Sequence, residues 1–444
     1  MSAPRSPRKR WWDSQDMRVT AAEGQAWDLY DSVYRHTEFD AGVLQEYRSE
    51  RLAELRERAR STAAYREVDD EWPSTATVTR KSDFVRRMED YRTGEVDPLD
   101  VIRVRTSGTT GRPAVFEHSE EHLVHAAASR LRTFDAYGIG VSDRILRISG
   151  NPAHPLVDFP SKAGGGSMIR LNAGLIDREN AEYVSRLLRD YAAPVLWAQP
   201  MELLLFAGKL REHLSAFPAP SRVLSHGDSL DEGARRVCAE IFQERPLDLY
   251  GLQEFGMIAW ECPEAAGTYH VNDEKVVVET DHDGALLITN LVNRASVMAR
   301  YRPEDRGTLV SERCPCGRVL SRISGLVGRQ RSFIATDDGR FVNVKQVELY
   351  LDSLSLSRWR VVQTRAGELD VLCTLETELP LQQKEEMSER IARVAGQRRV
   401  GVRVVPLAEM MTAAGKSPRF ELFATQAWLA RRVGEDHDGA LSGA

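Results

Sequence analysis

The segment that decides the fold is Arg105-Thr106-Ser107-Gly108-Thr109-Thr110-Gly111-Arg112-Pro113. Its two glycines let the backbone turn tightly and bring N–H groups close to a ligand. Hydroxyl groups that can donate further hydrogen bonds come from Thr106, Ser107, Thr109 and Thr110, and Arg112 adds a permanent positive charge. Short β-type runs lie on either side of the segment. We therefore predict a polyphosphate-binding loop; the alternative is an ordinary polar hairpin turn.

The spacing of the glycines distinguishes this loop from the P-loop of the common NTPases. That P-loop has four residues between its glycines and then Lys-Ser/Thr, whereas Gly108 and Gly111 are separated by two residues and Arg112-Pro113 follows. The segment resembles the phosphate loop of the adenylate-forming superfamily, which contains acyl-CoA synthetases, luciferases and adenylation domains. Within that superfamily it is most similar to the phenylacetate–CoA ligase branch. The resemblance implies that residues 106–112 bind ATP.

Length and composition define the broad class of the protein. A chain of 444 residues predicts two or three domains. Charged residues make up 28% and nearly balance at a net charge of −6, which is no footprint for nucleic acid. No apolar run approaches the ~20 residues of a membrane span, and five cysteines do not make a disulfide scaffold. We expect a cytoplasmic enzyme of small molecules with no nucleic-acid or membrane partner; a homodimer is left open.

The order of apolar runs predicts an α/β fold. Short strands alternate with helical patterns over 144–250, which indicates a parallel sheet covered by helices. Runs at 276–279, 285–291 and 296–301 follow without helices and predict a β-rich subdomain. A small α+β unit comes next, with a hairpin (359–364 with 369–374), a helix at 381–395 and a strand at 400–405. We predict a large domain over 20–328 with the ATP and substrate sites, a small mobile lid over 329–433, and disordered tails at 1–19 and 434–444.

A second motif, Tyr250-Gly251-Leu252-Gln253-Glu254, follows a predicted strand and so lies at the edge where open α/β sheets bind ligands. A tyrosine ring beside a glycine suits a flat base, and a carboxylate is a hard oxygen ligand for Mg²⁺. The resemblance implies that Tyr250 and Gly251 line the adenine pocket and that Glu254 holds Mg²⁺. It assigns the α-phosphate contact to Gln253, where the family usually has a hydroxyl residue. The turn with Gly227 and Asp228 corresponds to the adenine-side turn.

Two further motifs follow in the order that the family requires. Arg300-Tyr301-Arg302-Pro303-Glu304-Asp305 resembles the segment whose Asp binds both ribose hydroxyls, so Asp305 is assigned to ATP. Arg329 matches the hinge arginine that contacts the nucleotide. Near the end, Gly415-Lys416-Ser417 matches the family's catalytic loop, whose lysine bridges the carboxylate and the α-phosphate. The resemblance thus names Lys416, Glu254 and Arg329 as catalytic residues.

Four residues outside the nucleotide motifs have the chemistry of a zinc site. Cys262 and His270 precede Cys314-Pro315-Cys316, and three thiols with one imidazole can complete a tetrahedral Zn²⁺ site. Four protein ligands would close the site, which makes it structural. The alternative is separate buried cysteines, as we expect for Cys238 and Cys373.

The resemblance carried by these motifs implies an AMP-forming ligase that activates a small, aromatic acid as its acyl-adenylate and transfers it to coenzyme A. In the branch, a Gly-Val-Asn-Val-Phe-Pro type segment shapes the thiol tunnel, but this chain has Gly339-Arg340-Phe341-Val342-Asn343-Val344, and only Gly339 fits in register. Other acceptors therefore stay open: a carrier protein, an amine, or nitrite activation to diazotise an aryl amine in secondary metabolism. A degenerate nucleotide-binding regulator is the non-enzymatic alternative.

Overall fold

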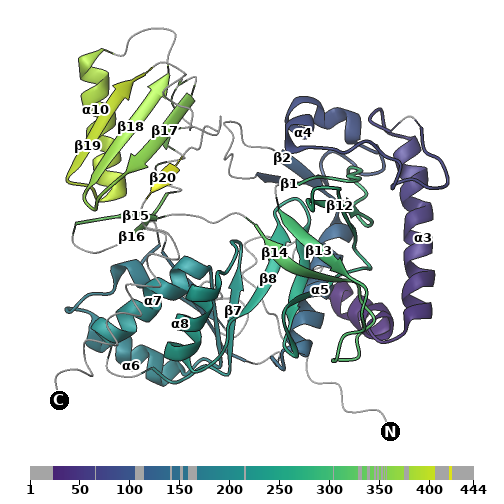
Figure 1. Ribbon diagram of the computed structural model, residues 1–444, viewed down its shortest axis with the longest axis horizontal. Coiled ribbons are helices and arrows are strands. Elements are labelled where there is room, and N and C mark those ends of the chain that lie inside the picture. Colours follow the sequence, from purple (N-terminus) through teal and green to yellow (C-terminus); the bar gives the residue numbers. More distant parts are fainter. Residues whose placement is uncertain are drawn as a thin grey trace.

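The computed structural model describes residues 24–422 apart from 66, 106–114, 141–142, 151–153, 159–167, 215–216, 304, 329–332, 338–340, 345–346, 348–349, 352–353, 355, 357, 375–379 and 406–419. Its centre is a ten-stranded sheet, ordered β13-β14-β10-β9-β8-β7-β6-β3-β5-β4 (Figure 1). The strands are β3 (Ile145–Ser149), β4 (Val157–Asp158), β5 (Met168–Asn172), β6 (Val195–Ala198), β7 (Arg222–His226), β8 (Leu247–Leu252), β9 (Gly256–Cys262), β10 (Ala265–Val271), β13 (Arg306–Val310) and β14 (Arg322–Val327).

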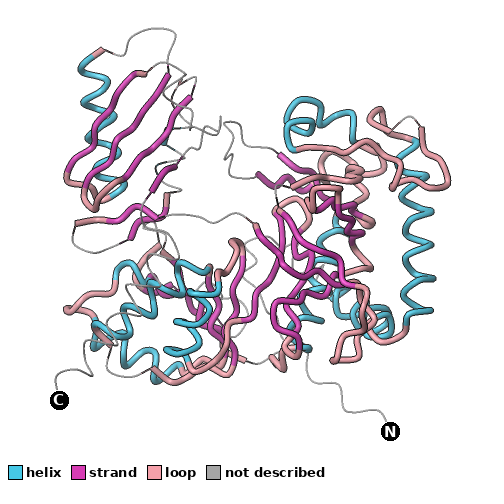
Figure 2. Tube along the Cα trace, in the orientation of Figure 1, coloured by secondary structure: helices cyan, strands magenta, loops and turns pink. Residues whose placement is uncertain are grey.

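The predicted parallel sheet is present as the five adjacent strands β8, β7, β6, β3 and β5. All four residues of β6, Val-Leu-Trp-Ala, are buried, as expected of a central strand with both faces covered. Helices cover one face of the sheet: α6 (Ala181–Tyr191), α7 (Pro200–Glu212) and α8 (Glu232–Phe242). Helix α5 (Glu120–Ala136) packs on the other face through Phe134. Figure 2 shows the helices in cyan beside the magenta strands of the sheet. This arrangement confirms the predicted α/β class.

Antiparallel strands extend the sheet beyond the predicted parallel part. Strands β9, β10, β14 and β13 continue it on one side, and β4 lies antiparallel at the other edge. A hairpin of β11 (Val276–Thr280) and β12 (Leu286–Asn290) packs next to them. The expected strand at 296–301 is wrong, because this segment forms only isolated bridges at Ser296 and Tyr301. It runs over the hairpin as an irregular buried segment.

The N-terminal part supports this β-rich region from outside. It contains η1 (Tyr30–Tyr34), α2 (Arg35–Thr37), α3 (Ala41–Arg60), α4 (Lys81–Arg87), η2 (Met88–Tyr91) and the hairpin of β1 (Ile102–Arg105) and β2 (Val115–His118); a short η3 (Ala173–Leu175) follows β5. The helices of this part are interrupted at Asp40, whose side chain accepts hydrogen bonds from the first turn of α3.

A second, four-stranded sheet lies apart from the large one, at the upper left of Figure 1. Its order is β19-β18-β17-β20, with β17 (Arg358–Gln363), β18 (Glu368–Thr374), β19 (Arg399–Val404) and β20 (Phe420–Leu422), and α10 (Leu381–Ala395) covers it. The short pair β15 (Phe333–Ala335) and β16 (Phe341–Asn343) lies before it in the chain. Helix α10 ends at Gly396, whose positive φ of 62° favours glycine.

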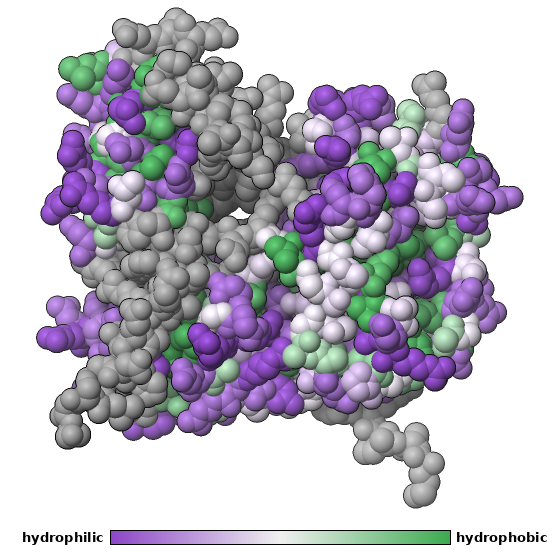
Figure 3. All heavy atoms as spheres, in the orientation of Figure 1, coloured by the Kyte–Doolittle hydropathy of each residue, from purple (hydrophilic) through white to green (hydrophobic). Residues whose placement is uncertain are grey.

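Hydrophilic side chains cover much of the described surface in the view of Figure 3. No helix among the described residues is long and apolar enough to span a bilayer. Cys238 and Cys373 are both fully buried, as predicted for core cysteines.

Candidate active site

The site is built on the turn that joins β8 to β9. The Phe255 N–H donates to the Leu252 carbonyl at 3.0 Å, which closes a tight turn with Glu254 inside it. Gly251 is required just before this turn, because a Cβ there would lie 2.7 Å from the Gly256 carbonyl oxygen. Glu254 is only 6% exposed. The backbone geometry therefore holds a buried carboxylate at the carboxyl end of the parallel strands, the edge at which open α/β sheets bind ligands.

Two tyrosine–carboxylate pairs join segments that are about fifty residues apart in the chain. The Tyr250 hydroxyl donates to Asp305 Oδ2 at 2.9 Å, and the Tyr301 hydroxyl donates to Glu254 Oε1 at 2.9 Å. All four side chains are buried. Burial, followed by the charge of Asp305, raises the pKa of Tyr250 well above its usual value, so this hydroxyl stays protonated and remains a donor. The second and third motifs of the sequence thus meet in space.

The turn after β7 completes the same site. Gly227 has a φ of +87°, a conformation that favours glycine. Two residues later, the Ser229 hydroxyl accepts a hydrogen bond from the Gly328 N–H at 2.6 Å. A Cβ on Gly328 would lie 3.0 Å from both Ser229 Oγ and Asp305 Oδ1, so only glycine fits without a shift. The structure therefore brings the Gly227–Ser229 turn, Asp305 and the end of the large sheet together.

The chemistry of this arrangement fits a nucleotide with a divalent cation. Asp305 supplies an acceptor-only carboxylate of the kind that binds vicinal hydroxyls. Within the described residues, Tyr301 is the only hydrogen-bond partner of Glu254 and contacts Oε1 alone, so Oε2 remains for a hard cation. Tyr250, at 8% exposure, offers a ring at the edge of the same turn.

The four predicted zinc ligands lie together at the other end of β9. Cys262 ends this strand, His270 lies on the adjacent β10, and Cys314 and Cys316 come from the loop between β13 and β14. Their ligand atoms all lie within 4.8 Å of one another. Burial lowers the pKa of His270 to about 3, which keeps the imidazole neutral, the form that binds metals.

The spacing of these ligand atoms fits a tetrahedral metal. Zn–S bonds of about 2.3 Å and Zn–N bonds of about 2.0 Å imply tetrahedron edges of about 3.5–3.8 Å. Cys262 Sγ lies 3.7 Å from Cys314 Sγ, and Cys316 Sγ lies 3.2 Å from His270 Nε2. The first distance is an ideal edge, and the second is slightly short. The four side chains thus lie in one cluster and not in separate parts of the core.

Comparisons with known proteins bear on the identity of the fold and the site. No family model matches the chain. It is 27% identical over 334 residues to a phenylacetate-coenzyme A ligase of Thermus thermophilus, a match that covers 67% of this chain and 68% of that one. It is 24% identical over 287 residues to a phenylacetate-coenzyme A ligase of Escherichia coli, covering 59% of this chain and 62% of that one.

The chain is a relative of the phenylacetate–CoA ligases. The resemblance to this branch of the adenylate-forming superfamily is thereby confirmed. A solved structure of 2-hydroxyisobutyryl-CoA ligase with 2-HIB-AMP and CoA, in the thioesterification state, supports the fold. It covers 96% of this chain and 93% of its own at a TM-score of 0.55 and 16% identity.

Some predicted site residues of this phenylacetate–CoA ligase relative lie outside the described residues. They are the phosphate loop 106–112, Arg329 and Lys416, whose assignments stay predictions. Among the described ones, Gly227, Asp228, Tyr250, Gly251, Glu254 and Asp305 come from the three segments that converge. Gln253 is exposed next to Glu254. Its contact with an α-phosphate is likewise a prediction.

The sequence reasoning missed the partners that orient these side chains. Tyr301 lies inside a quoted motif, but its bond to Glu254 depends on how the segment 296–301 folds over β12. Ser229 likewise follows the adenine-side turn without a predicted role. A hydroxyl-bearing residue inside each motif is the only signal that could have pointed to them.

Proposed function

We propose that the protein is an AMP-forming acid ligase that activates a small carboxylic acid with ATP and releases pyrophosphate. The observation that carries the proposal is the convergence of Tyr250, Asp305 and Glu254 at the carboxyl end of β8 in a relative of phenylacetate–CoA ligases. In the first half-reaction a carboxylate oxygen attacks the α-phosphorus of ATP. The bond from that phosphorus to the bridging oxygen breaks, and pyrophosphate leaves.

The chain's own residues bind and orient the nucleotide. Asp305 accepts hydrogen bonds from the ribose hydroxyls, and Tyr250 packs at the base. Glu254 would hold Mg²⁺, and the bound ion would neutralise part of the phosphate charge. We assign the phosphate contacts to the loop 106–112, and further contacts with the nucleotide and the reacting carboxylate to Arg329 and Lys416. Gln253 donates its amide N–H to the α-phosphate in place of a hydroxyl.

We propose coenzyme A as the acceptor of the second half-reaction and an aromatic acid as the substrate. The thiol sulfur attacks the acyl carbonyl carbon, AMP departs with the bonding electrons, and the thiol proton passes to solvent. Both relatives are named as ligases of phenylacetate and coenzyme A, which supports these assignments.

A second candidate is an adenylate-forming enzyme that does not use coenzyme A. The observation that favours it is the segment Gly339–Val344, which departs from the thiol-tunnel pattern of the branch. A carrier protein, an amine or nitrite would then replace the thiol. A regulator that only binds nucleotide is disfavoured by the oriented carboxylate of Glu254.

We also propose that Cys262, His270, Cys314 and Cys316 hold one structural Zn²⁺. Four protein ligands leave no open position for a reacting group. Strand β9 spans seven residues, or about 20 Å, between this cluster and the Glu254 turn. The metal would therefore anchor the far end of the strand that carries the active-site turn.

Pyrophosphate release across a panel of carboxylic acids tests the proposal. The panel is run with ATP and Mg²⁺, and each active acid is then run with coenzyme A, nitrite or amines. We expect acid-dependent release that falls by about 100-fold or more in Glu254→Gln, because the neutral amide is a poor cation ligand.

Glu232→Gln is the matched control, since Glu232 lies exposed in the first turn of α8. It should release pyrophosphate at the wild-type rate. Release that no acid stimulates, with ATP still bound, would instead support the regulator. Wild-type release from Glu254→Gln would remove Glu254 from the site.

A further inference from the structure

A lysine lies fully buried beneath the turn that carries Glu254. Lys275 directly precedes β11 and has no exposed surface. Its Nζ donates to the Phe255 carbonyl at 2.9 Å and to the Met257 carbonyl at 2.6 Å. A Cβ placed on Gly256, the residue between them, would lie 3.5 Å from the same Nζ. The ammonium group therefore binds the backbone on both sides of Gly256, the residue at which β9 begins.

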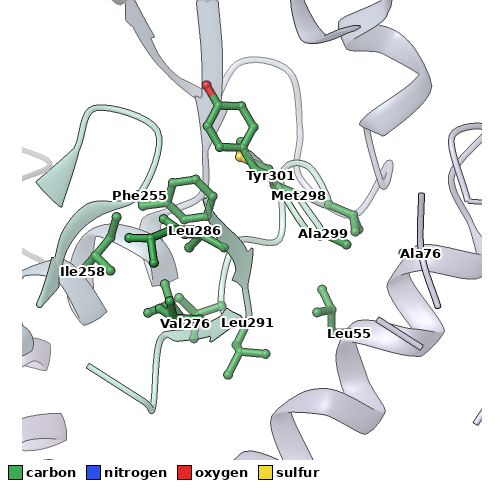
Figure 4. Close-up of a cluster of buried hydrophobic side chains, with 14 of the residues drawn as sticks. Leu55, Ala76, Phe255, Ile258, Val276, Leu286, Leu291, Met298, Ala299 and Tyr301 are labelled. Atoms are coloured by element: carbon green, nitrogen blue, oxygen red, sulfur yellow. The ribbon is translucent and has the colours of Figure 1, made fainter. Parts of the chain in front are cut away.

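The contacts made by Lys275 continue to the carboxylate itself. The ring of Phe255 packs against Tyr301 at a centroid distance of 5.6 Å, and the Tyr301 hydroxyl donates to Glu254 Oε1. Figure 4 shows Phe255 and Tyr301 in one buried cluster with Val276, the neighbour of Lys275. Lys275, Phe255, Tyr301 and Glu254 thus form a continuous series of contacts around the turn.

The surroundings of Lys275 argue against a role in stabilising the fold through charge. Among the described residues, no carboxylate forms an ion pair with it. Burial, followed by the charges of Arg130 and Arg132, lowers the pKa of Lys275 to about 7. The charge of Lys275 in turn lowers the pKa of three buried histidines, His118, His122 and His125. A buried ammonium group costs free energy unless its hydrogen bonds repay that cost.

We infer that Lys275 is a positioning residue that fixes the Glu254 turn for cation binding. Its two hydrogen bonds hold the Phe255 and Met257 carbonyls in place, and this orients Glu254 through Phe255 and Tyr301. The inference rests on the proposed role of Glu254 as a ligand of Mg²⁺. Substitutions that disturb the orientation of a metal ligand weaken metal binding or activity by about 10- to 100-fold.

Lys275→Met tests the inference, with Lys209→Met as its matched control. Lys209 is another buried lysine, on α7, whose contact is with Glu212 of the same helix. Amide hydrogen exchange is measured without any ligand. Exchange in a peptide covering 250–258 should rise in Lys275→Met, stay unchanged in Lys209→Met, and stay unchanged in both for β6.

The second measurement is the Mg²⁺ dependence of pyrophosphate release. We expect the half-saturating Mg²⁺ concentration to rise about 10-fold in Lys275→Met, with the melting temperature within a few degrees of wild type. Lys275→Gln should give an intermediate value, because its amide retains N–H donors for the two carbonyls. A uniform loss of protection over the sheet would mean that Lys275 only supports the core, and would overturn the inference.

The same experiment separates the two proposals. If the wild type shows no Mg²⁺-dependent release, the proposed function fails, whereas the exchange data still report on the turn. If wild-type release depends on Mg²⁺ and Lys275→Met shows the same dependence, only the inference fails. Failure of both Lys275→Met and Lys275→Gln to fold would also overturn it, since the lysine would then be needed for folding itself.

Discussion

The two ends of strand β9 carry sites of opposite design. At its start, Glu254 has one hydrogen-bond partner within the described residues, Tyr301. At its end, Cys262 lies in a group of three thiols and one imidazole whose ligand atoms are within 4.8 Å of one another. We propose that the Glu254 end, here called the open end, binds Mg²⁺ for a reaction together with groups from elsewhere in the chain. The Cys262 group, here called the closed end, would hold a structural zinc ion, so that one strand carries a reactive site at one end and a stabilising site at the other.

The largest effect we expect comes from replacing Lys416, which we propose adds the catalytic cation to the site at the Glu254 end of β9. Lys416→Ala should slow acyl-adenylate formation by about 10³-fold, because a charge positioned only in the transition state affects turnover more than binding. ATP affinity should change little, since Tyr250 and Asp305 lie on the large sheet side. The measurement is single-turnover pyrophosphate release with an active acid from the panel.

Chemically supplied acyl-adenylate provides the internal check for Lys416→Ala. It should be converted at a near-normal rate, and Arg393→Ala, which removes an exposed cation of α10, should behave as wild type in both steps. Equal loss in both half-reactions would mean that Lys416 acts on the fold and that the open end of β9 is complete without it.

Substitutions in the Cys262 cluster should lower the stability of the fold and leave the chemical steps largely unchanged. Cys262→Ser should lose the bound zinc and about 3–5 kcal/mol of unfolding free energy, because binding free energy of a structural metal is also folding free energy. Cys238→Ser is the matched control: both cysteines are fully buried, but Cys238 lies on the core-facing side of α8, away from the cluster. Metal analysis and thermal unfolding with and without a chelator give the answer.

The chelator decides between a metal site and ordinary packing. It should lower the melting temperature of the wild type and of Cys238→Ser but leave Cys262→Ser unchanged. If the two variants are equally destabilised and neither they nor the wild type contain zinc, the cluster is a set of buried thiols and an imidazole without a metal. The two ends of β9 would then not differ in the way proposed.

Strong local patterns made parts of this fold predictable. Helix α10 has the predicted bounds, since amphipathic periodicity and the flanking Pro380 and Gly396 mark them. The β9–β10 hairpin was missed. One reason is Glu261, a fully buried carboxylate within β9 that is paired with Arg235 and Arg245. A charged residue in a sequence predicts an exposed position, because the partners that would allow its burial are not known from the sequence.

The candidate site also contains residues that could be predicted from the sequence and residues that could not. Tyr250, Glu254 and Asp305 could be named because their motifs have a recognisable order, and the four proposed zinc ligands because three thiols and an imidazole are typical ligands of this metal. Lys275 could not, because its carbonyl partners carry no side-chain signal and are brought to it by the pairing of β8 with β9. Residues that hold other residues in place are set by tertiary packing.

The smallest effect we expect is a loss of unfolding free energy at acidic pH, caused by the buried His118 near the Glu254 end of β9. Burial, with a smaller contribution from the charge of Lys275, lowers the pKa of His118 to about 4. The unfolded chain binds this proton below its ordinary value of about 6.5. Between pH 6.5 and 4 the unfolded state therefore holds more protons, and stability falls as the pH falls. At pH 5 the loss from this one histidine is about 2 kcal/mol.

His118→Leu isolates that contribution. The drop in unfolding free energy between pH 7.5 and pH 5, measured by urea titration, should be smaller in His118→Leu than in the wild type by about 2 kcal/mol. Acid also protonates the ligands of the Cys262 cluster, but both proteins keep that cluster, so its share cancels in the difference. An identical drop in the two proteins would show that His118 is not held neutral in the fold. Acid sensitivity would then belong to the closed end of β9 or to the neighbouring histidines, His122 and His125.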